Sequence, residues 1–268
     1  PKLSIDFKGG TLIAVNYTGL IDINDVRTSM EKVDIEGQIY DFSKAEIKHF
    51  GDLSNVALRI ASFENEPENF TKYLTNKMAS LYPNLVPKNE DNFILAIEKV
   101  GPKIGAELRG DAIMAILSAL LLILIYITIR FELKYAMGAI AALSHDVLVT
   151  LGIFSLFGYE ISLAVIAAFL TIVGYSLNDT IVIFDRVREN ANMLKKSKLI
   201  SVINQSINDS LSRTIVTSIT TFFVVLILFL FGGEVLHTFS FAMIIGVLVG
   251  TYSSIFVASP VVVYMDKN

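Results

Sequence analysis

Residues 171–190 read TIVGYSLNDTIVIFDRVREN, and this stretch decides how the whole chain is interpreted. A long apolar run leads into it, and then Asn178 and Asp179 stand side by side before apolar residues resume. An ionised aspartate in the middle of a lipid bilayer costs on the order of 3 kcal/mol. A carboxyl group in such a place is therefore expected either to move an ion or to hold helices together.

The composition of the chain is typical of a membrane protein. Of its 268 residues, 53% are hydrophobic, and the mean hydropathy is +0.58, which is too apolar for an ordinary soluble domain. The net charge of −4 argues against a nucleic-acid partner. The absence of cysteine excludes disulfides, thiolate metal sites and a cysteine nucleophile.

Charged residues divide the chain into two domains. Residues 1–111 contain 13 Lys or Arg and 17 Asp or Glu, whereas residues 112–268 contain nine of each. Within the second part, five apolar stretches reach or approach the length of about 20 residues that a helix needs to cross a bilayer. We therefore predict a water-exposed domain over residues 1–110 and a transmembrane helix bundle over residues 111–268. The five predicted spans are residues 112–129, 136–157, 161–184, 214–231 and 238–265.

The basic residues of the second domain predict its orientation. They occur only in alternate connections and in the C-terminal tail, and such residues mark the cytoplasmic side. The first domain then lies outside and the C-terminus inside. Because a chain that begins outside needs something to carry it there, we expect a sixth span upstream of residue 1. The nine basic residues are Arg130, Lys134, Arg186, Arg188, Lys195, Lys196, Lys198, Arg213 and Lys267.

The outer domain has the pattern of an α+β fold. Its strand and helix signals follow the order βαββαβ, which predicts a ferredoxin-like sandwich. Residues 35–44 fit this order less well and are expected to form an extra strand or a loop. The predicted elements are a strand at 11–17, a helix at 22–33 with Val26, Met30 and Val33 on one side, a hairpin over 45–62 that turns at 52–54, a helix at 66–83 and a strand at 92–101.

The polar residues of the predicted spans form the candidate site. Tyr175 and Ser176 lie one helical turn before Asp179, on its face. Arg213 opens the fourth span, which is antiparallel to the third, so an Asp179–Arg213 pair is feasible; alternatively Arg213 is only a cytoplasmic anchor. Arg213 lies within a stripe of hydroxyl residues, namely Ser210, Thr214, Thr217, Ser218 and Thr221.

Other features of the spans have a packing interpretation beside a functional one. His145 and Asp146 are adjacent in the second span and form either a self-satisfied polar pair or part of the site. Gly246 and Gly250 form a G-x-x-x-G motif, which favours close helix contact. Pro260 is expected to kink the inner end of the fifth span.

Enzyme chemistry fits the sequence poorly. The stretch before Asp179 is Ser176-Leu177-Asn178 and lacks the glycine of the G-x-G-D motif of intramembrane aspartyl proteases. The three histidines, 49, 145 and 237, are scattered, and no H-E-x-x-H motif or phosphate-binding loop occurs. We expect no enzyme activity, no metal and no cofactor, which leaves an ion gradient as the energy source.

Several segments resemble the SecF family of protein-export membrane proteins, part of the wider SecD/SecF group. They are IDFKGG (5–10), VGPKIGAELRGDAI (100–113), YITIRFELKYAMGAIAALSHDVLVTLGIF (126–154) and VGYSLNDTIVIFDRVREN (173–190). The resemblance implies a six-span protein of the bacterial cytoplasmic (inner) membrane with one large external domain. It also implies a bundle similar to that of resistance–nodulation–division (RND) transporters.

The resemblance further implies partners and residue roles. The expected partners are SecD, the SecYEG translocon, an exported unfolded polypeptide and membrane lipid. Together with SecD, such a protein uses the proton motive force to promote late stages of export. The family's proton-conducting aspartate and arginine match Asp179 and Arg213, with Asn178 and Thr180 beside the aspartate and Tyr175, Ser176, Thr217, His145 and Asp146 in support. The hinge to the outer domain is expected at Gly9, Gly10, Gly101 and Gly105.

Two other functions remain open from the sequence. One is a half-transporter on the same scaffold that exports a small molecule or lipid. The other is a passive scaffold of the translocon in which Asp179 only joins helices. An aspartate pathway is also able to carry sodium in place of protons.

Overall fold

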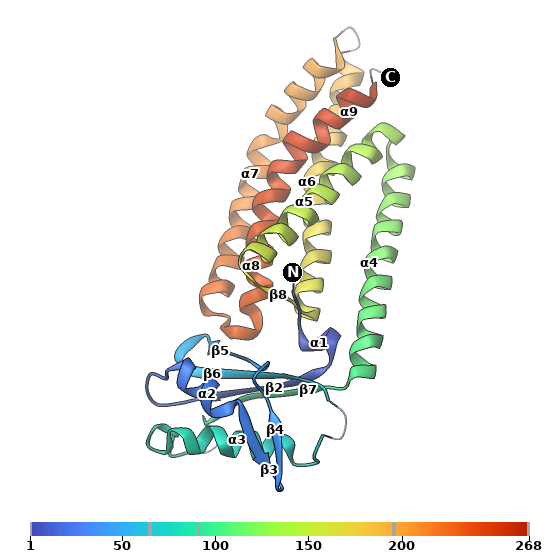
Figure 1. The fold of residues 1–268 in the computed structure, drawn as a ribbon. Coiled ribbons are helices and arrows are strands. Elements are labelled where there is room, and N and C mark those ends of the chain that lie inside the picture. The colour runs from blue at the N-terminus through green and yellow to red at the C-terminus, as the bar shows by residue number, and fades with distance from the viewer. Residues whose placement is uncertain (1, 64–65, 90–91, 195–196, 267–268) are drawn as a thin grey trace. The chain divides into compact units, whose positions relative to one another are not determined.

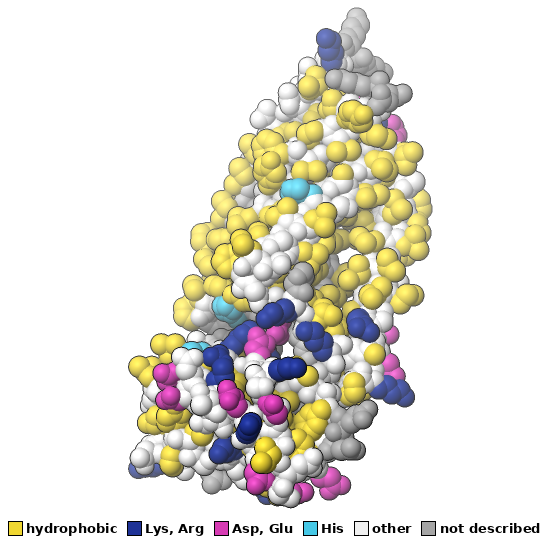
Figure 2. All heavy atoms as spheres, in the orientation of Figure 1, with side chains coloured by type: hydrophobic (Ala, Val, Ile, Leu, Met, Phe, Trp, Pro, Cys, Tyr) yellow, Lys and Arg dark blue, Asp and Glu magenta, His cyan; other side chains and the backbone are white. Residues whose placement is uncertain are grey.

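The computed structural model describes residues 2–63, 66–89, 92–194 and 197–266, with no side chains described at 234–235 (Figure 1). The chain forms two compact units, one of residues 3–111 and one of residues 112–266 to which Lys2 at the start of β1 also belongs. Figure 2 shows charged side chains gathered over the first unit and hydrophobic side chains covering the helices of the second. Lys195, Lys196 and Lys267, three of the predicted cytoplasmic charges, lie outside the described residues.

The first unit is a mixed α/β structure built on one four-stranded sheet. The strands run in the order β5-β6-β2-β7, and each neighbouring pair is antiparallel. Its elements are β1 (Lys2–Leu3), α1 (Ile5–Lys8), β2 (Gly10–Asn16), α2 (Ile23–Met30), β3 (Lys32–Ile35), β4 (Gln38–Asp41), β5 (Glu46–Phe50), β6 (Asp52–Ala61), α3 (Phe70–Leu81), η1 (Pro83–Leu85) and β7 (Ile94–Val100).

The core of this unit lies between the sheet and the helices α2 and α3. Ile13 on the central strand β2 packs in one cluster with Met30 of α2 and Leu74 of α3, and all three are fully buried. The Tyr17 hydroxyl donates a hydrogen bond of 2.7 Å to the Met78 carbonyl of α3. Burial raises the pKa of Tyr17 well above its usual range, so the hydroxyl stays a donor at physiological pH.

The structure corrects three details of the predicted outer domain. The helix expected over 22–33 ends at Met30, and Val33 belongs to β3, because the chain turns into an added hairpin there. This β3–β4 hairpin accounts for residues 35–44. The hairpin expected to turn at 52–54 turns instead at Gly51, whose φ of +78° favours glycine, so residues 52–54 are part of β6.

The second unit contains five helices that are long and apolar enough to cross a membrane. They coincide with the five predicted spans, and this prediction is confirmed. The third and fourth run well past their apolar stretches, to Met193 and from Leu199, and so extend the bundle at one end. The helices are α4 (Pro102–Arg130), α5 (Leu133–Leu156), α6 (Leu163–Met193), α7 (Leu199–Phe231) and the succession α8 (Gly233–Ser253), η3 (Ser254–Ala258) and α9 (Ser259–Asp266), with a short strand β8 (Glu160–Ile161) before α6.

Small residues allow the spanning helices to approach closely, as the G-x-x-x-G motif predicts. A Cβ on Gly246 of α8 would lie 2.2 Å from a side-chain carbon of Ile172 on α6, and one on Gly250 would lie 3.0 Å from the Ser176 Cβ. On α5, a Cβ on Gly138 would lie 2.8 Å from the Ala258 carbonyl oxygen. Helix packing in lipid relies on such contacts, because lipid tails are as apolar as the side chains.

Pro260 follows an unusually wide helical turn that the sequence does not predict. The turn before it, η3, is a π-helix. Proline has no N–H and crowds the carbonyl one turn earlier, so a wider turn accommodates it. The Ser259 hydroxyl donates to the Ser254 carbonyl at 3.2 Å and satisfies one of the acceptors in this turn.

The helix contact at Gly138 can be tested with a matched substitution on the same helix. We expect Gly138→Ala to destabilise the bundle by about 1–3 kcal/mol, since the new methyl group meets a backbone carbonyl that cannot rotate away. Gly152→Ala, where nothing lies within 4 Å, should be neutral or slightly stabilising. Unfolding midpoints of both variants in the same detergent measure the difference, and equal midpoints would contradict the packing described here.

Candidate functional site

Asp179 lies inside the helix bundle without the partners that a carboxylate usually has. Its side chain is on α6 and the residue is 3% exposed. Its Oδ2 atom is buried and has no hydrogen-bond partner among the described residues, and the same holds for the Tyr175 hydroxyl and the Thr214 hydroxyl. An unsatisfied buried carboxyl oxygen is costly in structural terms. Such an atom is available to take or release a proton.

The direct Asp179–Arg213 ion pair that the sequence suggested is not formed. The ion pairs described around the helices join Arg130 to Asp185, Lys134 to Glu132 and Asp266, His145 to Asp146, and Arg186 to Glu189 and Asp209, and none of those described reaches Asp179. Arg213 is exposed on α7. The Ser218 hydroxyl of α7 lies 2.7 Å from the Thr251 hydroxyl of α8.

The other predicted pathway residues divide between buried and exposed positions. Thr180 is buried, and its hydroxyl donates to the Ser176 carbonyl at 3.2 Å on the same helix. Asn178 is exposed on the chain surface, so it does not line the same interior as Asp179. The Thr217 hydroxyl donates to the carbonyls of Arg213 and Thr214 and therefore satisfies its own helix.

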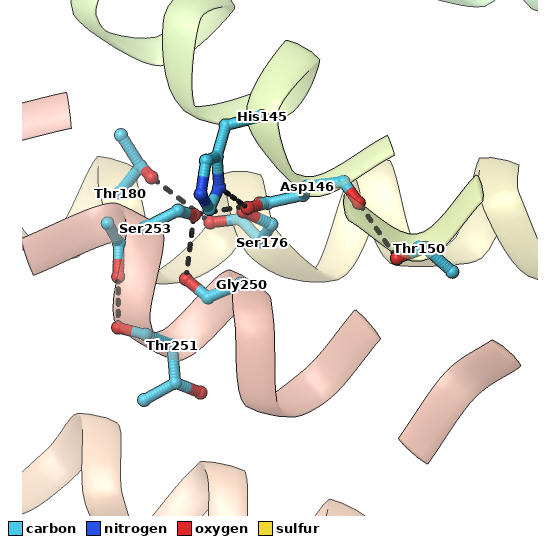
Figure 3. A network of polar contacts seen from close by, with 9 residues as sticks. His145, Asp146, Thr150, Ser176, Thr180, Gly250, Thr251 and Ser253 are labelled. Atoms are coloured by element: carbon cyan, nitrogen blue, oxygen red, sulfur yellow. Dashed lines mark hydrogen bonds and ion pairs between the residues drawn. The ribbon is translucent and has the colours of Figure 1, made fainter. Parts of the chain in front are cut away.

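Asp146 is the best-connected polar side chain in the bundle (Figure 3). It is 0% exposed on α5, and its Oδ2 accepts hydrogen bonds from Ser176 of α6 at 2.6 Å and from Ser253 of α8 at 2.8 Å. Its Oδ1 lies 3.0 Å from Nδ1 of His145. His145 and Asp146 thus form the predicted polar contact inside the bundle, and the carboxylate also accepts hydrogen bonds from two further helices.

Sequence reasoning missed Ser253, and it did not pair Ser176 with Asp146. Ser176 was placed beside Asp179 because both lie on α6, yet its hydroxyl turns to α5. A serine next to a G-x-x-x-G motif is the signal that was available, because close helix approach brings small polar side chains into range of the neighbouring helix. The spacing of residues along one helix does not show which neighbouring helix such a side chain will contact.

A second missed cluster lies at the end of α6, beyond the apolar stretch. The Asn190 side chain donates to the Ser206 hydroxyl and to the Asp209 carboxylate of α7, at 3.0 Å each. Arg186 pairs with Glu189 at 2.7 Å and lies 4.0 Å from Asp209. These contacts hold the extended ends of α6 and α7 together.

Three of the four glycines predicted to form the hinge lie in a crowded place in the first unit. A Cβ on Gly9 would lie 2.8 Å from the Pro102 Cα, one on Gly10 would lie 2.5 Å from the Ile60 carbonyl oxygen, and one on Gly105 would lie 3.0 Å from the Gly9 nitrogen. Gly101 has nothing within 4 Å. The first three glycines thus serve close packing, while the space around Gly101 is open.

The chemistry of this arrangement is that of protons and hydrogen bonds. Within the described ranges, no group of three or more His, Asp or Glu side chains is placed to hold a metal ion. The site consists of two carboxyl groups, one imidazole, one guanidinium and several hydroxyl groups on α5 to α8. Such groups exchange protons and change helix packing as their charge changes.

Comparison with known proteins identifies the family. The sequence model described as "Protein export membrane protein SecD/SecF, C-terminal" matches residues 83–268. A protein translocase subunit SecF from Calditerrivibrio nitroreducens is 45% identical over all of this chain and 84% of its own length. The chain belongs to the SecF family of protein translocase subunits. A SecF from Rhodothermus marinus is 44% identical over 98% of this chain and 82% of its own length.

Solved structures agree with membership of the SecF family. The crystal structure of SecDF, a translocon-associated membrane protein from Thermus thermophilus, matches all of this chain with a TM-score of 0.84 and 37% identity. This chain covers 35% of that one, so it corresponds to about a third of SecDF. A heavy metal efflux pump matches with a TM-score of 0.51 and 11% identity, which shows a shared fold alone. The chain is a multi-pass membrane protein.

The two buried aspartates should differ in their effect on stability. We expect Asp146→Ala to lower the free energy of unfolding by about 2–4 kcal/mol, because it leaves two serines and a histidine without their acceptor. Asp179→Ala should cost less than about 1 kcal/mol, since its Oδ2 has no hydrogen bond to lose. Denaturant titrations of the purified variants measure both values, and the reverse order would contradict the hydrogen bonding described here.

Proposed function

We propose that this chain pairs with a SecD-type subunit and uses the proton motive force to promote late stages of protein export across the bacterial cytoplasmic membrane. The observation that carries the proposal is the buried, unpartnered carboxyl oxygen of Asp179 in a membrane-spanning helix. Asp146, by contrast, accepts hydrogen bonds from Ser176 and Ser253 at its Oδ2 atom. Asp179 instead keeps an oxygen free for a proton.

Arg213 supplies the second state of this site. When Asp179 is ionised, the guanidinium of Arg213 on α7 stabilises its charge. When Asp179 binds a proton, that attraction is lost, and α6 and α7 are free to shift against each other. Because Arg213 is exposed and forms no ion pair with Asp179 among the described residues, its side chain is able to move toward or away from the carboxyl group as the charge changes.

The exposed polar side chains of the spans support a partner in the membrane. Asn178 and Thr171 are exposed on α6, and Thr220 is exposed on α7. Polar groups that face lipid are costly, and membrane helices place them against other helices. The spans of a SecD-type subunit are the occupant that family membership favours, since the related Thermus protein carries SecD and SecF in one chain by its name SecDF. Lipid then covers the apolar remainder of the bundle.

The energy available from protons sets the scale of the movement. One proton that crosses a potential of 100 mV supplies about 2.3 kcal/mol. This amount shifts the equilibrium between two helix arrangements but does not by itself pull a long polypeptide. Several proton cycles are therefore expected for each exported chain.

The outer unit completes the proposal. We infer that it is a ferredoxin-like sandwich with the β3–β4 hairpin added, and the strand order β5-β6-β2-β7 with α2 and α3 between the strands supports this. The distribution of basic residues supports an extracytoplasmic position for residues 1–110 and a cytoplasmic C-terminus. There the unit would meet the unfolded exported polypeptide as it leaves the SecYEG translocon.

The central test replaces the acid group without changing its shape. We expect Asp179→Asn to assemble in the membrane and to lose the gradient-dependent part of export, because asparagine cannot exchange a proton at this site. Export of a reporter protein from membrane vesicles, measured with the gradient intact and after an uncoupler, checks this. Asp185→Asn is the matched control, since Asp185 is on the same helix, half-exposed and paired with Arg130.

Each alternative function predicts a different result. A passive scaffold predicts that Asp179→Asn reduces the amount of complex recovered and leaves the response to the uncoupler unchanged. A small-molecule or lipid half-transporter predicts normal export and accumulation of that compound. A sodium-coupled protein predicts dependence on a sodium gradient, and normal gradient-dependent export in Asp179→Asn contradicts the proposal itself.

The proposed orientation can be tested directly because the chain has no cysteine. Lys44 and Asn192 are both exposed, the first in the outer unit and the second at the end of α6. We expect a membrane-impermeant thiol reagent to label Lys44→Cys in intact spheroplasts and to label Asn192→Cys only after lysis. The opposite pattern would invert the topology.

A further inference from the structure

The buried carboxylate of Asp146 has a single neighbour in the described structure that can carry positive charge. Between Lys134 and Arg186 the sequence contains no Lys or Arg, and neither do residues 233–266. These ranges include the parts of α5, α6, α8 and η3 that pack around Asp146. The ion pair described for its carboxylate is with His145, at 3.0 Å.

The remaining titratable groups on the packed helices do not offset this charge. On α6, Tyr175 and Asp179 lie on either side of Ser176, and Asp185, Arg186, Arg188 and Glu189 follow at least nine positions after Ser176. Among the described side chains of α8, His237 lies near the start of the helix, and Tyr252 lies beside His145 with ring centres 6.2 Å apart. η3 has no titratable side chain, and on α9 Tyr264 and Asp266 lie toward the cytoplasmic end predicted above, where Asp266 pairs with Lys134. His145 therefore decides the net charge of this place in the bundle.

We infer that His145 and Asp146 together form a second proton-binding site, separate from Asp179, in which the imidazole and the carboxylate share one exchangeable proton. With that proton the pair is electrically neutral, either as imidazolium and carboxylate or as imidazole and carboxylic acid. Without it, a net negative charge is buried, which is costly in an apolar interior. Two interacting groups of this kind titrate as a unit.

The pair has one buried end and one exposed end. Asp146 has no exposed surface, whereas the His145 side chain is 31% exposed and reaches from the carboxylate to the surface of this chain. The serine hydroxyls of α6 and α8 occupy Oδ2 and leave Oδ1 to the imidazole. A proton that arrives at the outer nitrogen of His145 thus enters the pair without any opening of the bundle.

Proton binding at this site would change the hydrogen bonds between three helices. The hydrogen bonds from Ser176 and Ser253 to Oδ2 are strong while Asp146 is ionised and weaken once a proton resides on the carboxyl group. Ser176 is one turn before Asp179 on α6, and Ser253 is the last residue before the π-helix η3. The proton state of the pair therefore biases how α5, α6 and α8 pack beside Asp179. This inference stands whether or not Asp179 couples a gradient to export.

The test observes the imidazole itself. The full chain, co-purified with its SecD-type partner and carrying isotope-labelled histidine, is placed in lipid nanodiscs and followed by NMR across a pH series. We expect His145 to gain a proton on acidification in the wild type and to stay neutral over the same range in Asp146→Asn. His49 and His237 are internal references that should behave alike in both samples. Asp185→Asn, which removes a carboxylate in contact with Arg130, should leave His145 unchanged.

Two results would overturn the inference. One is a pair in which neither the imidazole of His145 nor the labelled carboxyl group of Asp146 gains a proton over the series in the wild type. The other is a titration of His145 that is the same in the wild type and in Asp146→Asn. If the variant does not fold, the wild type decides the question: labelled aspartate carboxyl signals of Asp146 should move at the same pH as those of His145, and movement of His145 alone contradicts a shared proton.

Discussion

The free-energy cost of burying a carboxyl group among apolar helices constrains the structure of this bundle. The bundle meets that cost in two ways on neighbouring helices. Asp146 is surrounded by two hydroxyl groups and an imidazole, so its hydrogen bonds are made inside the chain. Asp179 keeps a buried oxygen without a partner, and its counter-charge on Arg213 is held at a distance. In the first arrangement hydrogen bonds from neighbouring helices stabilise the carboxylate, and in the second an oxygen is left without such bonds.

Close helix approach is the condition for both arrangements. The glycines of α8 allow α6 to come near enough for Ser176 and Ser253 to reach the same carboxylate oxygen. The π-helix after Ser253 then widens the chain before Pro260. A larger side chain at Gly246 or Gly250 would separate the helices and break the hydrogen bonds between them. The hydrogen bonds between these helices therefore depend on the close packing at the glycines.

Membership of the SecF family agrees with the presence of two different units in this chain. The chain joins a charged α/β unit to an apolar bundle that holds two acidic groups, and the related Thermus structure has the same fold over the whole of this chain. The fold is shared more distantly with a heavy metal efflux pump.

The sequence by itself determined the five spans, the α/β character of the outer unit, the small-residue contact at Gly246 and Gly250, and Asp179 as the residue of interest. These features follow from hydropathy, periodicity and composition, which are local along the chain. Tertiary structure alone decided that Ser176 turns to Asp146, that Arg213 stays out of direct contact with Asp179, and that Asn178 faces outward. Such outcomes depend on how each helix is rotated and crossed against its neighbours, and the spacing of residues on one helix does not contain that information.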